Sequence, residues 1–250
     1  MRVRFCGLIS SIAFKMEHPK LFRTCQQLLN QLVYRQKDQG LNNLAKKVLC
    51  IRGKTWIWDD KTWVMGILNI TPDSFSDGGL YNNNPVERAL ELSRSGADLI
   101  DIGGMSTRPG SEPIPIEDEL KRCIPPIKEI RSLNDDLIIS IDTYRSVVAQ
   151  EAINAGADLI NDVSGGLFDP GMFETMAKAK VPVVIMHLRG SKIQYFHDLA
   201  PETMSQLVEY KDDDVIAEIV ESLHSRVQKA ISVGVRRWNI ILDPGIGKRG

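Results

Sequence analysis

The fold is decided by two similar stretches, Gly96-Ala-Asp-Leu-Ile-Asp-Ile-Gly-Gly104 and Gly156-Ala-Asp-Leu-Ile-Asn-Asp-Val-Ser-Gly-Gly166. Each begins at a glycine suited to end a helix, enters an apolar strand and leaves through a glycine pair. A repeat of this kind indicates quasi-equivalent βα units that follow one another in a barrel. The predicted fold class is therefore α/β.

Outward from these stretches, further short apolar runs alternate with helical segments. Near-continuous apolar strands separated by helices are typical of parallel strands covered on both faces. The predicted strands are Val64–Leu68, Leu99–Ile102, Leu137–Ile141, Leu159–Ile160 with Val163 close behind, Val181–Met186 and Ile240–Leu242. They make about six of the eight units of a TIM-type (β/α)8 barrel, which needs two more strands for closure.

Capping residues mark the predicted helices. Asn and Pro suit the start of a helix, and Gly suits its end. The helices are expected from Asn84-Pro85 to Gly96, through Ile116–Ile127 with a kink at Pro125-Pro126, over residues 145–155, and between residues 201 and 234 with a break near residues 212–214.

The first part of the chain has a different character. Residues 1–53 are predicted to be an extension or linker, with helical spacing over Gln26–Tyr34, and residues 54–250 to be the barrel. Alternating large side chains around Asp59-Asp60 predict a β-hairpin over Lys54–Trp63. The basic, acid-poor start could instead be a mitochondrial transit peptide.

Composition excludes several classes of function. A formal net charge of −1 argues against a nucleic-acid partner, and no apolar run is long enough to span a membrane. The four cysteines are scattered without metal-ligand spacing, which favours reduced thiols. A cytoplasmic location is predicted, with the mitochondrion as the alternative.

Polar residues end one predicted strand after another. In a (β/α) barrel these ends converge on the face where active sites are built. One such residue alone could cap the next helix, but six at the same end favour an active site. They are Asn69, Asp101, Asp142, Asn161 with Asp162, His187 and Asp243. For His187, a hydrogen-bonded structural role is favoured over ligand contact.

The loops beyond the strands indicate the chemistry of the ligand. Residues 69–79 form a long polar stretch ending in glycines, and residues 103–110 combine backbone donors, two hydroxyls and an arginine. The second set suits a phosphate-like anion. The strand-end carboxylates suit instead an N–H-rich ligand edge or a metal.

Residues 64–79 and 96–110 resemble the two signature motifs of the dihydropteroate synthases. Shorter matches follow in family order, namely Ser140-Ile-Asp-Thr143, Ile160-Asn-Asp162, Ile185-Met-His187 and Leu242-Asp-Pro-Gly245. The resemblance runs from about Trp56 to Gly247. The extension before it is similar to the multidomain folate-synthesis proteins of fungi.

The resemblance implies a reaction and a set of site residues. The family joins p-aminobenzoate to a dihydropterin methyl pyrophosphate, releasing pyrophosphate, with Mg²⁺ as cofactor. It implies that Asp142, Asn161 and Asp243 hold the pterin, with Asp101 beneath and Met186 packed on the ring. It further implies that Asn69 contacts Mg²⁺ or pyrophosphate, that Thr107, Arg108 and Pro109 meet pyrophosphate or p-aminobenzoate, and that Phe75 and Asp77 lie on the first loop.

The family's later elements have no counterpart in the sequence. We therefore expect this chain to be a piece of a longer protein, inactive and poorly stable alone, and a homodimer when full-length. Two alternatives stay open: a pterin-binding methyltransferase acting on methyltetrahydrofolate, and a non-catalytic remnant with a scaffold role.

Overall fold

The computed structural model describes residues 48–57, 63–70, 84–105, 113–188 and 215–245. Its main element is a parallel sheet of six strands in the order β3-β4-β5-β6-β7-β8. The strands are β3 (Met65–Asn69), β4 (Leu99–Gly103), β5 (Ile138–Asp142), β6 (Leu159–Asp162), β7 (Val183–Met186) and β8 (Ile240–Asp243). All six predicted strands are confirmed. Among the described residues no ladder joins β3 to β8, so this incomplete barrel is open between them.

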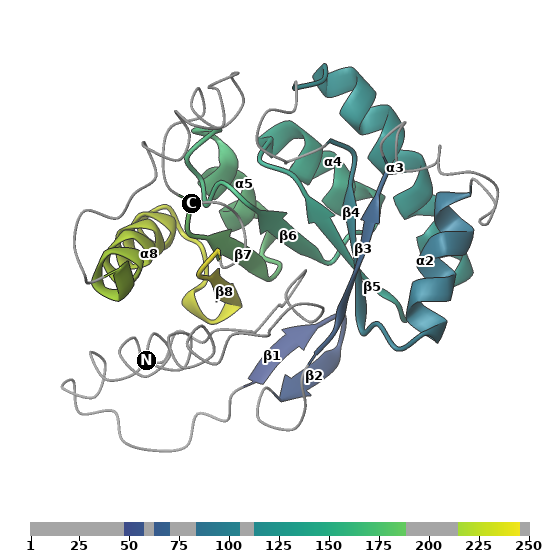
Figure 1. Cartoon of the computed structure of the whole chain (residues 1–250), viewed down its shortest axis with the longest axis horizontal. Coiled ribbons are helices and arrows are strands. Elements are labelled where there is room, and N and C mark those ends of the chain that lie inside the picture. The colour runs from purple at the N-terminus through teal and green to yellow at the C-terminus, as the bar shows by residue number, and fades with distance from the viewer. Residues whose placement is uncertain (1–47, 58–62, 71–83, 106–112, 189–214, 246–250) are drawn as a thin grey trace.

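Helices follow the strands around the sheet (Figure 1). They are α2 (Pro85–Arg94), α3 (Ile116–Leu133), α4 (Ser146–Ala155), α5 (Met172–Ala179) and α8 (Val215–Ser232), with a short 3-10 helix η4 (Arg237–Asn239) before β8. The helices predicted from Asn84 to Gly96, through Ile116–Ile127 and over residues 145–155 are found, and α3 is one continuous helix through Pro125-Pro126. Helix α8 accounts for the later part of the helix predicted between residues 201 and 234, whose earlier part, with the predicted break near residues 212–214, lies outside the described residues. The sequence did not predict α5, which has only eight residues. None of the described helices has the length and apolar character needed to cross a bilayer.

The predicted helix ends are explained by local hydrogen bonds. The Asn84 side chain accepts the backbone N–H of Val86 at 2.9 Å and caps α2. At the end of α4, Gly156 has φ of 111°, a left-handed conformation that suits glycine. Gly96, one residue beyond the C-cap of α2, has φ of 106°. The two repeats therefore begin with the same backbone geometry.

Alternate residues of each strand enter two different apolar layers. Ile100, Ile139 and Ile160 are fully buried with helix side chains in the outer layer. Their neighbours Leu99 and Ile138 belong to an inner cluster. This cluster lies near the amino ends of the strands, and that part of the sheet is referred to as its amino end. That cluster also contains hairpin side chains, so the hairpin covers the amino end of the sheet.

The hairpin consists of β1 (Val48–Ile51) and β2 (Lys54–Ile57), paired antiparallel. Arg52 and Gly53 both have positive φ, 51° and 72°, as a tight two-residue hairpin turn requires. The predicted hairpin over Lys54–Trp63 is corrected in this respect: residues 54–57 pair with the preceding residues 48–51. Two of the large side chains that suggested strand pairing across a turn, Trp56 and Trp63, instead stack on each other, with ring centroids 4.0 Å apart. The Asp59-Asp60 turn lies outside the described residues.

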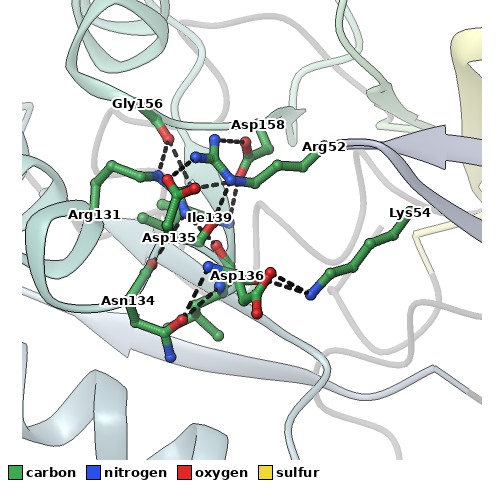
Figure 2. A network of polar contacts seen from close by, with 10 residues as sticks. Arg52, Lys54, Arg131, Asn134, Asp135, Asp136, Ile139, Gly156 and Asp158 are labelled. Atoms are coloured by element: carbon green, nitrogen blue, oxygen red, sulfur yellow. Dashed lines mark hydrogen bonds and ion pairs between the residues drawn. The ribbon is translucent and has the colours of Figure 1, made fainter.

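Charged side chains join the hairpin to the amino end of the sheet (Figure 2). Arg52 bonds to Asp135 and, at 3.1 Å, to Asp158. Arg131 donates to the other oxygen of Asp158 at 2.5 Å. Lys54 lies 3.1 Å from the Asp136 carboxylate. The hairpin spans residues 48–57 and so lies on both sides of the boundary predicted after residue 53. These contacts hold β1 as well as β2 against the sheet.

The region before the hairpin lies outside the described residues. This includes the predicted helix over residues 26–34, which stays a prediction, as does the division of the chain into an extension and a barrel.

Candidate functional site

One row of strand residues crosses the carboxyl end of the sheet. In register, Asn69 pairs with Gly103, Gly103 with Asp142, and Asp142 with Asn161. Gly103 contributes no side chain: a Cβ built on it would stand 3.4 Å from Asn69 Oδ1 and 3.6 Å from Asp142 Oδ2. The structure therefore brings Asn69, Asp142 and Asn161 together, as predicted from their positions at strand ends.

Asp101 lies one level below this row and connects three strands. Its Oδ1 accepts the Ser140 hydroxyl at 2.5 Å, and its Oδ2 accepts the Asn161 amide at 2.9 Å. Asp101 is only 4% exposed, so it is placed to orient other side chains. The bond from Asn161 Nδ2 leaves its Oδ1 as an acceptor for a ligand.

Met186 and Asp243 are paired in register between β7 and β8. They lie one level above the row that contains Asn161, toward the carboxyl end of the sheet. Met186 is buried in a small cluster with Tyr144 and Phe168. The Gly245 N–H donates to Asp243 Oδ1 at 2.8 Å, which fixes the carboxylate against the chain that follows it. Asp243 is half-buried.

His187 is buried and lies against helix α8. Its Nδ1 is 3.1 Å from Ser222 Oγ, and its backbone N–H donates to Asp243 O at 2.8 Å. Both contacts agree with the structural role favoured from the sequence.

A buried carboxylate on α3 supports the loop after β5. Glu119 is fully buried and accepts the Thr143 hydroxyl at 2.7 Å and Arg145 Nη1 at 2.8 Å. Burial raises the pKa of Glu119, while Thr143 and the charges of Arg145 and Arg122 act in the opposite direction. Since Thr143 directly follows Asp142, this network helps to set where Asp142 leaves its strand.

Five predicted site residues lie outside the described residues, so their roles stay predictions. They are Phe75, Asp77, Thr107, Arg108 and Pro109. The sequence pattern had predicted no role for Ser140 or Glu119. The signal for Ser140 was a hydroxyl within an otherwise apolar strand, whereas the burial of Glu119 within the acidic first turn of α3 had no sequence signal.

The oxygen donors present fit Mg²⁺ in a limited way. Asn69 Oδ1 lies beside Gly103 at the carboxyl end of β3, and hard oxygen ligands are those Mg²⁺ prefers. Within the described ranges, His, Cys, Asp and Glu do not gather into a metal-binding group of three. Such a site fits an ion that takes one or two protein oxygens and completes its shell with water and substrate phosphate.

Comparison with known proteins agrees with this geometry. The family described as pterin binding enzyme matches residues 65–250. The chain belongs to this family. This chain is 48% identical over 187 residues to the folic acid synthesis protein fol1 of Pneumocystis carinii, and 45% identical over 192 residues to the dihydropteroate synthase of a Synechocystis species. The resemblance to dihydropteroate synthases is therefore confirmed.

Solved structures show the same fold. The dihydropteroate synthase of Xanthomonas albilineans in complex with 7,8-dihydropteroate is 37% identical, with a TM-score of 0.64 over 81% of this chain and 67% of the other. The same enzyme with 4-aminobenzoic acid gives a TM-score of 0.67 over 81% and 68%.

The matched lengths differ among these relatives. The matches cover 74% and 76% of this chain, but only 24% of the Pneumocystis protein and 62% of the Synechocystis synthase.

Proposed function

We propose that this chain binds the pterin substrate of dihydropteroate synthesis. In that reaction the dihydropterin-6-ylmethyl group is transferred from pyrophosphate to p-aminobenzoate. The observation that carries the proposal is the row Asn69, Gly103, Asp142 and Asn161, with Asp101 fixed beneath it. It presents acceptor oxygens at the carboxyl end of a parallel barrel sheet, where a donor-rich ring can bind.

Each described residue has a proposed task in pterin binding. The Asp142 carboxylate accepts two parallel N–H bonds from the amino-pyrimidinone edge, which fixes the orientation of the ring. Asn161 and Asp243 accept further ring donors, and Met186 packs on the ring face. Asp101 holds Asn161 in place through its 2.9 Å bond.

The proposed reaction breaks the bond between the methylene carbon and the pyrophosphate oxygen, and the electron pair leaves with pyrophosphate. The arylamine nitrogen then bonds to the methylene carbon and loses a proton to water. An arylamine is neutral near pH 7, so no strong general base is needed. Bound Mg²⁺ would neutralise charge developing on pyrophosphate. Asn69, Thr107 and Arg108 are proposed to bind that anion.

Further features of the complete protein belong to the same proposal. We infer p-aminobenzoate and the dihydropterin pyrophosphate as partners, a homodimer when full-length, and a cytoplasmic location. Two relatives from plants carry the word mitochondrial in their names, which keeps the mitochondrial alternative.

The test separates ligand binding from turnover. Isothermal titration of the dihydropterin pyrophosphate into the chain, with Mg²⁺ and without p-aminobenzoate, should show one saturable site. Conversion of labelled p-aminobenzoate to dihydropteroate is then measured on the same sample. Binding without turnover would agree with the expectation that this chain is inactive alone. Absence of both would favour the scaffold alternative.

A further inference from the structure

Arg226 of helix α8 is a buried cation whose contacts are backbone carbonyls of two site loops. It is 9% exposed. Its Nη1 donates to Met186 O at 2.5 Å and to Ser164 O at 3.4 Å, and its Nη2 donates to Leu188 O at 2.6 Å. One side chain from outside the sheet thus joins the loop after β6 to both sides of His187.

The loop after β6 is shaped to admit this arginine. A Cβ on Gly165, which has φ of 59°, would stand 2.3 Å from Met186 O and 2.5 Å from Arg226 Nη1. The fully buried Asp162 carboxylate accepts the N–H groups of Ser164 and Gly166 at 2.8 and 2.7 Å. Burial lowers the pKa of Arg226 to about 10, and the charge of Asp162 acts against that shift.

The backbone held by Arg226 leads directly to two proposed pterin contacts. Met186 is itself one of them. The next residue, His187, donates its N–H to Asp243 O at 2.8 Å. A Cβ on Gly245 would stand 2.4 Å from His187 O, so the chains after β7 and β8 are in close contact.

We propose that Arg226 is a positioning residue for the pterin site: by fixing the backbone on both sides of His187, it places Met186 and Asp243 for the ring. Arginine suits this task because its planar fork presents donors in two directions, which a lysine ammonium cannot reproduce with the same geometry. The ligand named here rests on the proposed function.

Arg131 provides a matched control at the opposite end of the sheet. It too is largely buried and donates to backbone carbonyls, among them Gly156 O at 2.9 Å and Leu137 O at 2.8 Å. Arg226→Met and Arg131→Met both remove a cation and leave buried carbonyls without their donor. The two variants therefore share the general loss of stability and differ in which end of the sheet is released.

The experiment uses the full chain and two measurements. Amide hydrogen exchange is followed at the N–H groups of His187 and Gly245, which bond to Asp243, and the dihydropterin pyrophosphate is titrated calorimetrically. Arg226→Met should accelerate exchange at both amides and weaken pterin affinity about tenfold or more, equivalent to about 1.4 kcal/mol. Arg131→Met should leave unchanged the hydrogen exchange at both amides and the affinity of the folded protein for the dihydropterin pyrophosphate.

Equal exchange and equal affinity in the two methionine variants would overturn the proposal. If Arg226→Met does not fold, Arg226→Lys decides instead, since it retains a cation near Asp162; wild-type exchange and affinity in that variant would overturn the proposal. Faster exchange confined to the Arg226 variants, together with no pterin binding by the wild-type chain, would support the positioning role and contradict the proposed ligand.

Discussion

The two repeats can be compared at both ends of the sheet. At the amino end, Asp98 and Asp158 occupy equivalent positions in the two repeats. The Asp98 carboxylate accepts the backbone N–H of Val64, just before β3, at 2.9 Å, and the Asp158 carboxylate accepts that of Ile139, within β5, at 3.0 Å. Each also donates its own N–H to the carbonyl of that same residue.

At the carboxyl end, the equivalent residues of the repeats are Asp101 and Asn161, which bond to each other. The two repeats thus make the same contacts at the amino end of the sheet and carry different residues with different tasks at the carboxyl end. Changing one carboxylate to an amide converts two like charges into an acceptor and a donor, which interlock and leave Asn161 Oδ1 for a ligand.

The same residue types therefore serve stability at one end of the sheet and binding at the other, according to their partners. Asp158 is surrounded by protein donors, including Arg52 and Arg131. The row containing Asp142 instead presents oxygens at the face where barrel sites form. Substitutions at the amino end should therefore change the free energy of unfolding, and those at the carboxyl end should change ligand affinity.

The largest effect is expected for Asp158→Ala. The change leaves Arg131, with a side chain 12% exposed, without its ion-pair partner and removes the acceptor of Ile139 N–H. The free energy of unfolding should fall by about 3–5 kcal/mol, as when one partner of a buried pair is removed. Urea denaturation measures it. A loss of pterin affinity in the folded protein, without loss of stability, would reverse the assignment of the two ends.

A second prediction concerns the interlock between the repeats. Asp101→Asn places an amide where Asp101 now accepts two bonds, so pterin affinity should fall about tenfold to a hundredfold. The exchanged variant Asp101→Asn with Asn161→Asp restores one donor and one acceptor. It should recover most of the lost stability in denaturation and little of the affinity in titration calorimetry. Full recovery of affinity would show that only the pairing matters.

The third prediction is a pH dependence. Burial raises the pKa of Asp162 from 3.8 to about 6, while hydrogen bonds from Ser164 and Gly166 oppose the shift. The folded state thus binds this proton more tightly than the unfolded state. The resulting stability is fully present below pH 3.8 and is lost as the pH rises through about 6.

Asp162→Asn removes this titration. The wild type should lose up to about 1.4 kcal/mol more per pH unit across that window than the variant does. Urea denaturation at several pH values measures the slope, and parallel slopes would contradict the prediction.

The smallest effect is expected for Lys54→Ala. Its partner Asp136 has a side chain 86% exposed, so the ion pair should contribute about 0–1 kcal/mol to unfolding. Denaturation in low and high salt should show that any difference shrinks as salt is added. A larger loss would mean that the Lys54 contact contributes to holding the hairpin against the sheet.

The sequence predicted the strands because each is an apolar run that ends on a polar residue. It predicted the helix ends where a single residue, such as Asn84 or Gly156, determines the local backbone. The hairpin was misplaced because the Trp56 and Trp63 rings stack on each other, which alternation alone does not distinguish from pairing across a turn.

Much of the candidate site could be predicted, because strand-end residues converge whenever the strands are parallel. The supporting residues could not. Arg226 and Glu119 are charged residues on helices, where a solvated face is the usual outcome. Their burial results from helix packing, which depends on contacts between residues far apart in the sequence.

Pterin binding by the carboxyl-end row is tested by comparing Asp142→Ala with wild type in a titration of the dihydropterin pyrophosphate, after circular dichroism has shown that both are folded. The proposed function predicts a saturable site in the wild-type chain and no measurable binding in the variant. Equal affinity in the two proteins would show that the row of oxygens at the carboxyl end does not hold the pterin, and would contradict the proposed function.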